Sequence, residues 1–131
     1  MNKALQQDPQ RTAQVALKTF FNIMKAWHIE PYEQKALLGS QGNDIYEQWQ
    51  EGSTGSLSED VLIRISYIIS IYKGLSLMFN NRSQADSWIN KPNEHFNGVS
   101  ALEYILSDCT TTDVDERLCN VRTLIVTINA T

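Results

Sequence analysis

The chain has 131 residues, of which 42% are hydrophobic and 20% charged, proportions that suit a soluble protein folded as one domain or as two small lobes sharing a core. Its 15 acidic and 11 basic residues leave a net charge of −4, which argues against a nonspecific nucleic-acid binder, because such a protein needs surplus Lys and Arg. The two cysteines, Cys109 and Cys119, are too few for a disulfide framework.

Two stretches bear on the cellular location. Residues 1–10 lack the apolar run of a signal peptide. Residues 61–79 are rich in apolar side chains, but Arg64 and Lys73 interrupt them, and a membrane span would bury both charges. We therefore expect a cytoplasmic protein that keeps its cysteines reduced.

The N-terminal part is expected to form one long helix followed by two short ones. Asp8-Pro9 is a typical helix start, and Glu30-Pro31 ends that helix. A short helix over 32–38 closes at Gly39, and another stops near Gly52. The apolar positions at helical spacing are Ala13, Ala16, Leu17, Phe20, Met24 and Trp27 in the long helix, and Ile45, Tyr46 and Trp49 in the last one. Two short helices joined by a tight turn are typical of a helix-turn-helix.

A long helix over 59–79 follows the GSTGS connector at 52–56. Ser58 is its expected N-cap, and Leu57 with Leu62 can form a hydrophobic staple. Apolar residues occupy two faces of this helix; one carries Val61, Ile65, Ile68, Tyr72, Leu75 and Phe79, and the other carries Ile63, Tyr67, Ile71 and Met78. A helix that is apolar on two sides is buried between two groups of elements, so we expect it to be a shared spine.

The remaining part contains two expected capping boxes and one ambiguous segment. Ser83 with Asp86 predicts a short helix at 84–90, and Ser100 with Glu103 predicts another after the turn at Gly98. Residues 113–121 have helical spacing and an acidic start. Residues 122–129 are dense in β-branched side chains, which favour a strand, so their conformation stays open.

These elements predict an all-α fold, a small helical bundle. A helix-turn-helix lobe (1–57) is joined through the spine to a C-terminal helical lobe with its tail (58–131).

Catalysis is not expected, and neither is a metal or a cofactor. The sequence has no Gly-x-Ser-x-Gly elbow and no Gly-rich phosphate loop. His95 with Cys109 or Cys119 lacks an evident third group that would orient the pair. The acids Asp113, Asp115 and Glu116 suit a helix N-terminus better than a metal cluster.

DNA recognition is a second hypothesis, carried by the stretch SQGNDIYEQWQEG at 40–52. Amide side chains can pair with adenine, and a Tyr hydroxyl can reach a phosphate. The same stretch holds three acids, Asp44, Glu47 and Glu51, and no Lys or Arg, so a scaffold with little DNA affinity is equally well supported. The candidate DNA-binding residues are Gln41, Asn43, Tyr46, Gln48 and Gln50.

Three aromatic residues near the second capping box are candidates for a partner-binding anchor. Aromatic side chains are enriched at interfaces, but Trp88 and Tyr104 fit the core of a small lobe better. For Phe96, which lies in the connector, the two interpretations are balanced.

The run LIRISYIISIYKGLSLMFNNRSQADSWINKPNEHFNGVSALEYIL resembles the C-terminal toxin-binding domain of MbcA/ParS/Xre-type bacterial antitoxins. The matching segments are Arg64–Tyr67, Ile71–Leu75, Trp88–Asn93, Phe96–Leu102 and Val121-Arg122. The block W-x-x-x-P-N…F-x-G-x-S-A-L carries the most specific part of the likeness. The upstream segments ALLG, IYEQWQEG and LSEDVLIR resemble the family's Xre-like helix-turn-helix lobe, so the likeness spans about residues 13–125.

The resemblance implies an antitoxin that binds a RES-domain, NAD⁺-depleting toxin and occludes its active site. The implied toxin-binding residues are Phe96, Arg122, Ile125, Asn129 and Thr131. The guanidinium of Arg122 can occupy a site built for a phosphate-bearing dinucleotide, or it can pair locally with Asp115 or Glu116. A homodimer is also expected. The acidic recognition helix leaves operator binding in doubt, and a stand-alone helix-turn-helix regulator is the alternative function.

Overall fold

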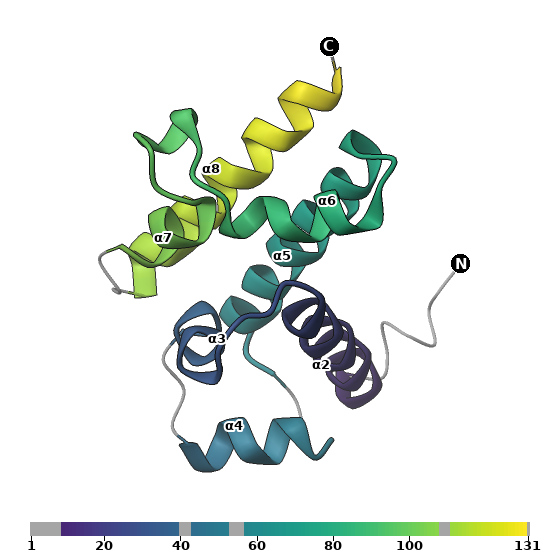
Figure 1. The fold of residues 1–131 in the computed structure, drawn as a ribbon. Coiled ribbons are helices and arrows are strands. Elements are labelled where there is room, and N and C mark those ends of the chain that lie inside the picture. Colours follow the sequence, from purple (N-terminus) through teal and green to yellow (C-terminus); the bar gives the residue numbers. More distant parts are fainter. Residues whose placement is uncertain (1–8, 40–42, 53–56, 108–110, 131) are drawn as a thin grey trace.

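The computed structural model describes residues 9–39, 43–52, 57–107 and 111–130, and within these ranges the fold is all-α, as predicted. The α-helices are α2 (Pro9–Ala26), α3 (Pro31–Leu37), α4 (Asn43–Gln50), α5 (Glu59–Met78), α6 (Arg82–Ser87), α7 (Ala101–Leu106) and α8 (Thr111–Ala130). Two short 3₁₀ helices, η1 (Trp88–Asn90) and η2 (Glu94–Phe96), lie between α6 and α7. Figure 1 shows α5 passing through the middle of the molecule, with α2 and α3 beside its first half, α4 below them at the edge, and α6, α7 and α8 around its second half.

Helix α5 is the spine that the two-sided apolar pattern predicts. Its N-cap is Ser58, whose Oγ accepts a hydrogen bond from the Val61 amide at 3.3 Å. It packs against α2, α6 and α8. By length and composition alone α5 is apolar enough to cross a membrane. Many of its apolar side chains, among them Val61, Ile65, Ile68, Ile71 and Leu75, are buried against other helices, as in the core helix of a folded protein, while Ile63 and Leu77 are exposed.

One apolar cluster runs through both halves of the chain, from Leu17 on α2 to Ile125 on α8. A polar link adds to it, because the side-chain amide of Asn90 donates to the carbonyl of Trp27 at 2.7 Å. The division into 1–57 and 58–131 stays a prediction about organisation. The core itself continues across that boundary.

Helix α8 settles the ambiguous C-terminal segment, since it continues as a helix to Ala130. The strand tendency of residues 122–129 is overridden by packing, because Val121 and Ile125 are buried on the side of α8 that faces the core. Contacts between α5 and α8 ascend together along both helices: Arg64 meets Asp115, Tyr67 meets Arg122, and further along Gly74 meets Asn129. The two helices therefore run parallel.

Caps and turns hold the connector before α7. The box at Ser100 is confirmed, because its Oγ accepts from the Glu103 amide at 3.0 Å while Glu103 accepts from the Ser100 amide at 3.2 Å. The predicted box at Ser83 is wrong: α6 begins at Arg82 because Asn81 caps it, accepting from the Gln84 amide at 3.1 Å. The helix expected over 84–90 also ends sooner, at Ser87, and η1 follows from Trp88.

The guanidinium of Arg64 is the main polar group inside the fold, with its side chain only 3% exposed. Its Nε and Nη2 donate to the carboxylate of Asp115 on α8. Its Nη1 donates to the carbonyl of Leu38 at the end of α3, at 3.3 Å. Gly39 makes room for this contact, because a Cβ there would lie 2.4 Å from Nη1, and its φ of +96° also suits glycine.

Helix α8 crosses α5 most closely at Gly74. A Cβ built on Gly74 would lie 2.4 Å from Cγ2 of Ile125, which is closer than real carbon atoms approach. The Gly74 carbonyl also accepts a hydrogen bond from the Asn129 amide at 3.1 Å. The absence of a side chain at residue 74 therefore sets the distance between the two helices.

We expect Asp115→Ala to lower the free energy of unfolding by about 2–3 kcal/mol, because hydrogen bonds to charged groups contribute about that much and Arg64 would stay buried without its carboxylate. Asp86→Ala is the matched control. It removes the exposed Arg82–Asp86 pair, so it should cost at most about 0.5–1 kcal/mol. Urea unfolding at neutral pH measures both. Equal losses would contradict a special role for the buried pair.

We expect Gly74→Ala to destabilise the protein by about 1–3 kcal/mol through overpacking, although Ala is normally the better helix former by about 1 kcal/mol. In the background of Ile125→Ala, which removes the clashing Cγ2, the same substitution should cost nothing or stabilise. The measurement is a double-mutant cycle by chemical denaturation. An identical effect of Gly74→Ala in both backgrounds would show that the close crossing is not its cause.

Candidate functional site

The largest exposed apolar side chains of α5 and α8 lie along the border between the two helices. Helix α8 packs inward through Val114, Leu118, Val121 and Ile125. Each following residue is turned by about 100°, so Cys119, Arg122 and Val126 lie beside α5. The exposed fractions are 39% for Ile63, 77% for Leu77 and 53% for Val126. We call this surface the α5–α8 face; it consists of Ile63, Tyr67 and Leu77 of α5 with Cys119, Arg122 and Val126 of α8.

Arg122 lies at the centre of the α5–α8 face. Its guanidinium carbon is 5.4 Å from the centroid of the Tyr67 ring, which is a cation–π distance. Its Nε is buried and has no hydrogen-bond partner among the described residues. The predicted local pairing with Asp115 is not formed, because that carboxylate is bound to Arg64. Arg122 therefore keeps hydrogen-bonding capacity that the described part of the chain does not use.

The phenol of Tyr67 is held neutral. Its pKa is raised above the usual value of 10.0, first by the charge of the neighbouring Cys119 and the hydrogen bond between the two side chains, and then by burial. Asp115 raises this pKa further, while Arg122 lowers it. Tyr67 therefore presents a neutral ring to the guanidinium of Arg122 at the centre of the α5–α8 face.

Two other residues that the resemblance implies as toxin contacts make packing or hydrogen-bond contacts within the chain. Ile125 is only 1% exposed and packs against Gly74, so it does not present a surface to a partner. Asn129 is exposed, but its amide holds α8 to the Gly74 carbonyl. Thr131 lies outside the described residues. The resemblance points to α8, and Ile125 lies on the side of that helix that faces the core.

Phe96 belongs to an aromatic cluster on another side of α8. Its ring stacks on Tyr104 with centroids 4.8 Å apart and meets Trp88 edge-on at 6.4 Å. The hydroxyl of Tyr104 accepts a hydrogen bond from Asn120 at 2.9 Å. Asn120 and Arg122 are about 200° apart around an α-helix, so the structure separates Phe96 from Arg122. One flat partner surface therefore does not contact both Phe96 and Arg122.

The predicted DNA-binding residues are only partly available. Tyr46 is 3% exposed, and its hydroxyl donates to Oε1 of Gln34, so the expectation that it touches a phosphate is wrong. Burial also raises the Tyr46 pKa. Gln50 is exposed, but its Nε2 donates to the Tyr46 hydroxyl at 3.2 Å. Gln41 and the side chain of Asn43 lie outside the described residues.

Gln34 is a residue that the sequence analysis missed. It is 9% exposed, and its Nε2 donates to the carbonyl of Ile29 at 2.9 Å while its Oε1 binds Tyr46. These bonds join the start of α3 to α4. The only signal in the sequence is a polar residue among the apolar positions of a short helix, which does not distinguish a buried amide from an exposed one.

Among the described residues, no three His, Cys, Asp or Glu side chains gather as a candidate metal site. The features that the sequence did not predict are Ile63 and Leu77. A helix that is apolar on two sides does not reveal which apolar residues stay exposed; the pattern places Ile63 on a buried face and assigns no role to Leu77.

Comparison with known proteins gives one informative relative. No protein-family model matches the chain, and no solved structure matches it. The chain is 39% identical over 90 residues to the protein named "Uncharacterized protein y4oB" of Sinorhizobium fredii (strain NBRC 101917 / NGR234), and the match covers 69% of each chain. At this identity and coverage, the chain belongs to the same family as the Sinorhizobium protein y4oB.

Proposed function

We propose that the protein is an antitoxin that binds a RES-domain, NAD⁺-depleting toxin and blocks its active site. The observation that carries the proposal is Arg122, whose Nε is buried without a partner among the described residues and which lies one helical turn before the exposed Val126 on α8. An interface anchor typically combines a desolvated Arg with an apolar surround. The resemblance of residues 64–122 to toxin-binding domains points to the same helix.

Charge supports this use of Arg122. An enzyme that consumes a dinucleotide binds its phosphate groups with cations and hydrogen-bond donors, which would repel a guanidinium. We therefore replace the expectation that Arg122 occupies the phosphate site with a contact to acceptor groups at the edge of the cleft. Stacking on Tyr67 fixes the direction of the guanidinium in advance, which reduces the entropy lost on binding. The proposal needs neither catalysis nor a cofactor from this chain. It places the protein in the cytoplasm, where NAD⁺ is consumed.

A second candidate function is a stand-alone helix-turn-helix regulator. The specific observation in its favour is the succession of α3 and α4 after the long helix α2, with α4 at the edge of the molecule (Figure 1). The described exposed charges of α4 and the residue after it, Glu47 and Glu51, are acidic and oppose DNA phosphates. We therefore rank this function second.

The test is co-purification with the product of the neighbouring gene, using substitutions rather than truncation. Deleting α8 would remove the buried residues Leu118, Val121 and Ile125 and unfold the core. We expect Arg122→Ala to weaken toxin binding by about 2 kcal/mol, roughly thirtyfold in Kd. Arg82→Ala is the matched control, because Arg82 also lies over a tyrosine ring, 4.7 Å from the centroid of Tyr72, but away from α8.

Circular dichroism melts of both variants establish that each is folded before binding is compared. Toxin binding that is unchanged by Arg122→Ala would remove Arg122 from the interface. If no complex forms with the wild-type chain and the protein instead retards its own promoter DNA, the regulator is the correct function and the antitoxin proposal is wrong.

A further inference from the structure

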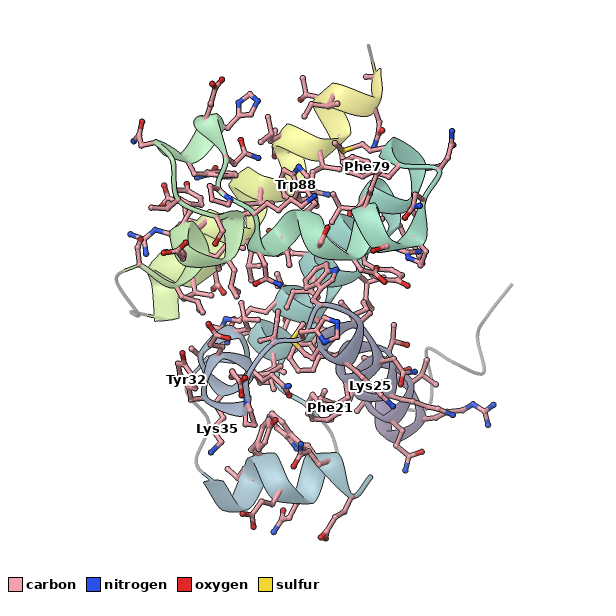
Figure 2. All side chains as sticks on the ribbon, viewed as in Figure 1. Phe21, Lys25, Tyr32, Lys35, Phe79 and Trp88 are labelled. Carbon is pink, nitrogen blue, oxygen red and sulfur yellow. The ribbon has the colours of Figure 1, made fainter. Side chains whose placement is uncertain are left out.

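A groove between α3 and α7 has a largely apolar lining and shares no residue with the α5–α8 face. Its volume is about 470 Å³. Tyr32, 72% exposed, and Val99, 39% exposed, stand at its walls, and Ala36 and Leu106 line it further. In Figure 2 the Tyr32 side chain projects from α3 on the side away from α2. We call this hollow the α3–α7 groove.

Two glutamates border the α3–α7 groove, and both are fixed in place by capping. The Oε1 atom of Glu33 accepts from the Glu30 amide at 3.1 Å, and Oε1 of Glu103 accepts from the Ser100 amide at 3.2 Å. The second carboxylate oxygen of each has no partner within the described parts of the chain. No Lys or Arg lines the groove. The groove therefore offers two pre-oriented negative charges beside an apolar wall.

The outer face of α2 has the opposite character. Arg11, Lys18 and Lys25 recur every seven residues, which places them on one side of the helix, and α2 contains no acidic residue. Val15, 55% exposed, lies on the same side between Arg11 and Lys18. Arg11 already interacts within its own chain, so the argument depends on Val15 and Lys18. Glu51 borders the same hollow as Lys18, but no ion pair joins the two.

We propose that α2 of one copy of the protein binds in the α3–α7 groove of a second copy. Val15 packs against Tyr32, Val99 and Leu106, and Lys18 pairs with Glu33 or Glu103. The argument is charge complementarity between two surfaces that the same chain exposes.

This contact is head-to-tail, because the α2 face and the groove are different surfaces of one molecule. A heterologous contact of this kind leaves one α2 and one groove unpaired at the ends, so copies add successively unless a ring closes. The α5–α8 face takes no part in it. Self-association is thus independent of the proposed toxin binding, and either can fail without the other.

The experiment is a mixing test with two complementary variants, measured by light scattering after size exclusion across a range of concentrations at low salt. Lys18→Glu disables α2 and keeps the groove. Glu33→Gln with Glu103→Gln removes the groove's charge but keeps both caps, because Gln also serves in a capping box. Lys73→Glu is the control, since Lys73 is an exposed cation on α5 outside both surfaces.

We expect the mass of the wild type and of Lys73→Glu to rise with concentration and to fall in 1 M salt, where charges are screened. Each disabled variant alone should associate about tenfold or more weakly. An equimolar mixture of the two should form a heterodimer that does not grow, because it contains one intact α2 and one intact groove. A wild type that stays monomeric, an association that both variants leave unchanged, or a mixture without heterodimers would each overturn the proposal.

Discussion

The fold depends on the burial of one guanidinium. Arg64 lies on the central helix α5 and is almost without solvent contact, and an isolated charge in that position would be very unfavourable. Its hydrogen bonds go to α3 through the Leu38 carbonyl and to α8 through Asp115. Both elements must therefore close on it together. The buried Arg64 guanidinium therefore holds the part formed by α2–α4 and the C-terminal part in one relative position.

Local rules predicted the elements that depend on neighbouring residues. The stripe along α2, the Ser58 cap, the turn at Gly39 and the capping box at Ser100 all follow from spacing within a few residues. The conformation of residues 122–129 did not follow, because the packing of Ile125 against Gly74 joins positions that are far apart in sequence. In the sequence, Arg64 stands out only as a charged residue within an apolar helix, and nothing nearby indicates that it is buried. Its partner, Asp115, is 51 residues away.

The candidate site shows the same limit. The resemblance indicated α8, and Arg122 does lie at its border with α5. Residues on one helix nevertheless differ by their angle around it, so Ile125 became core while Arg122 stayed half-buried. Tyr46 has an apolar ring and a polar hydroxyl, so its sequence position fits the surface and the core equally well. It is buried because its hydroxyl finds a hydrogen-bond acceptor in the buried Gln34 amide. Burial of this kind arises from tertiary packing, which spacing alone does not specify.

The parallel pairing of α5 with α8 has a consequence for synthesis of the protein. One side of the core around α5 is supplied by Val114, Leu118, Val121 and Ile125, which are translated about fifty residues after their partners. Until these residues leave the ribosome, the face of α5 that packs against α8 stays exposed to solvent, and Arg64 lacks the Asp115 carboxylate. The nascent chain therefore exposes an apolar helix for several seconds at ordinary elongation rates, and it is then a substrate for chaperones and proteases. Its cellular abundance should respond to those factors more than the stability of the finished fold suggests.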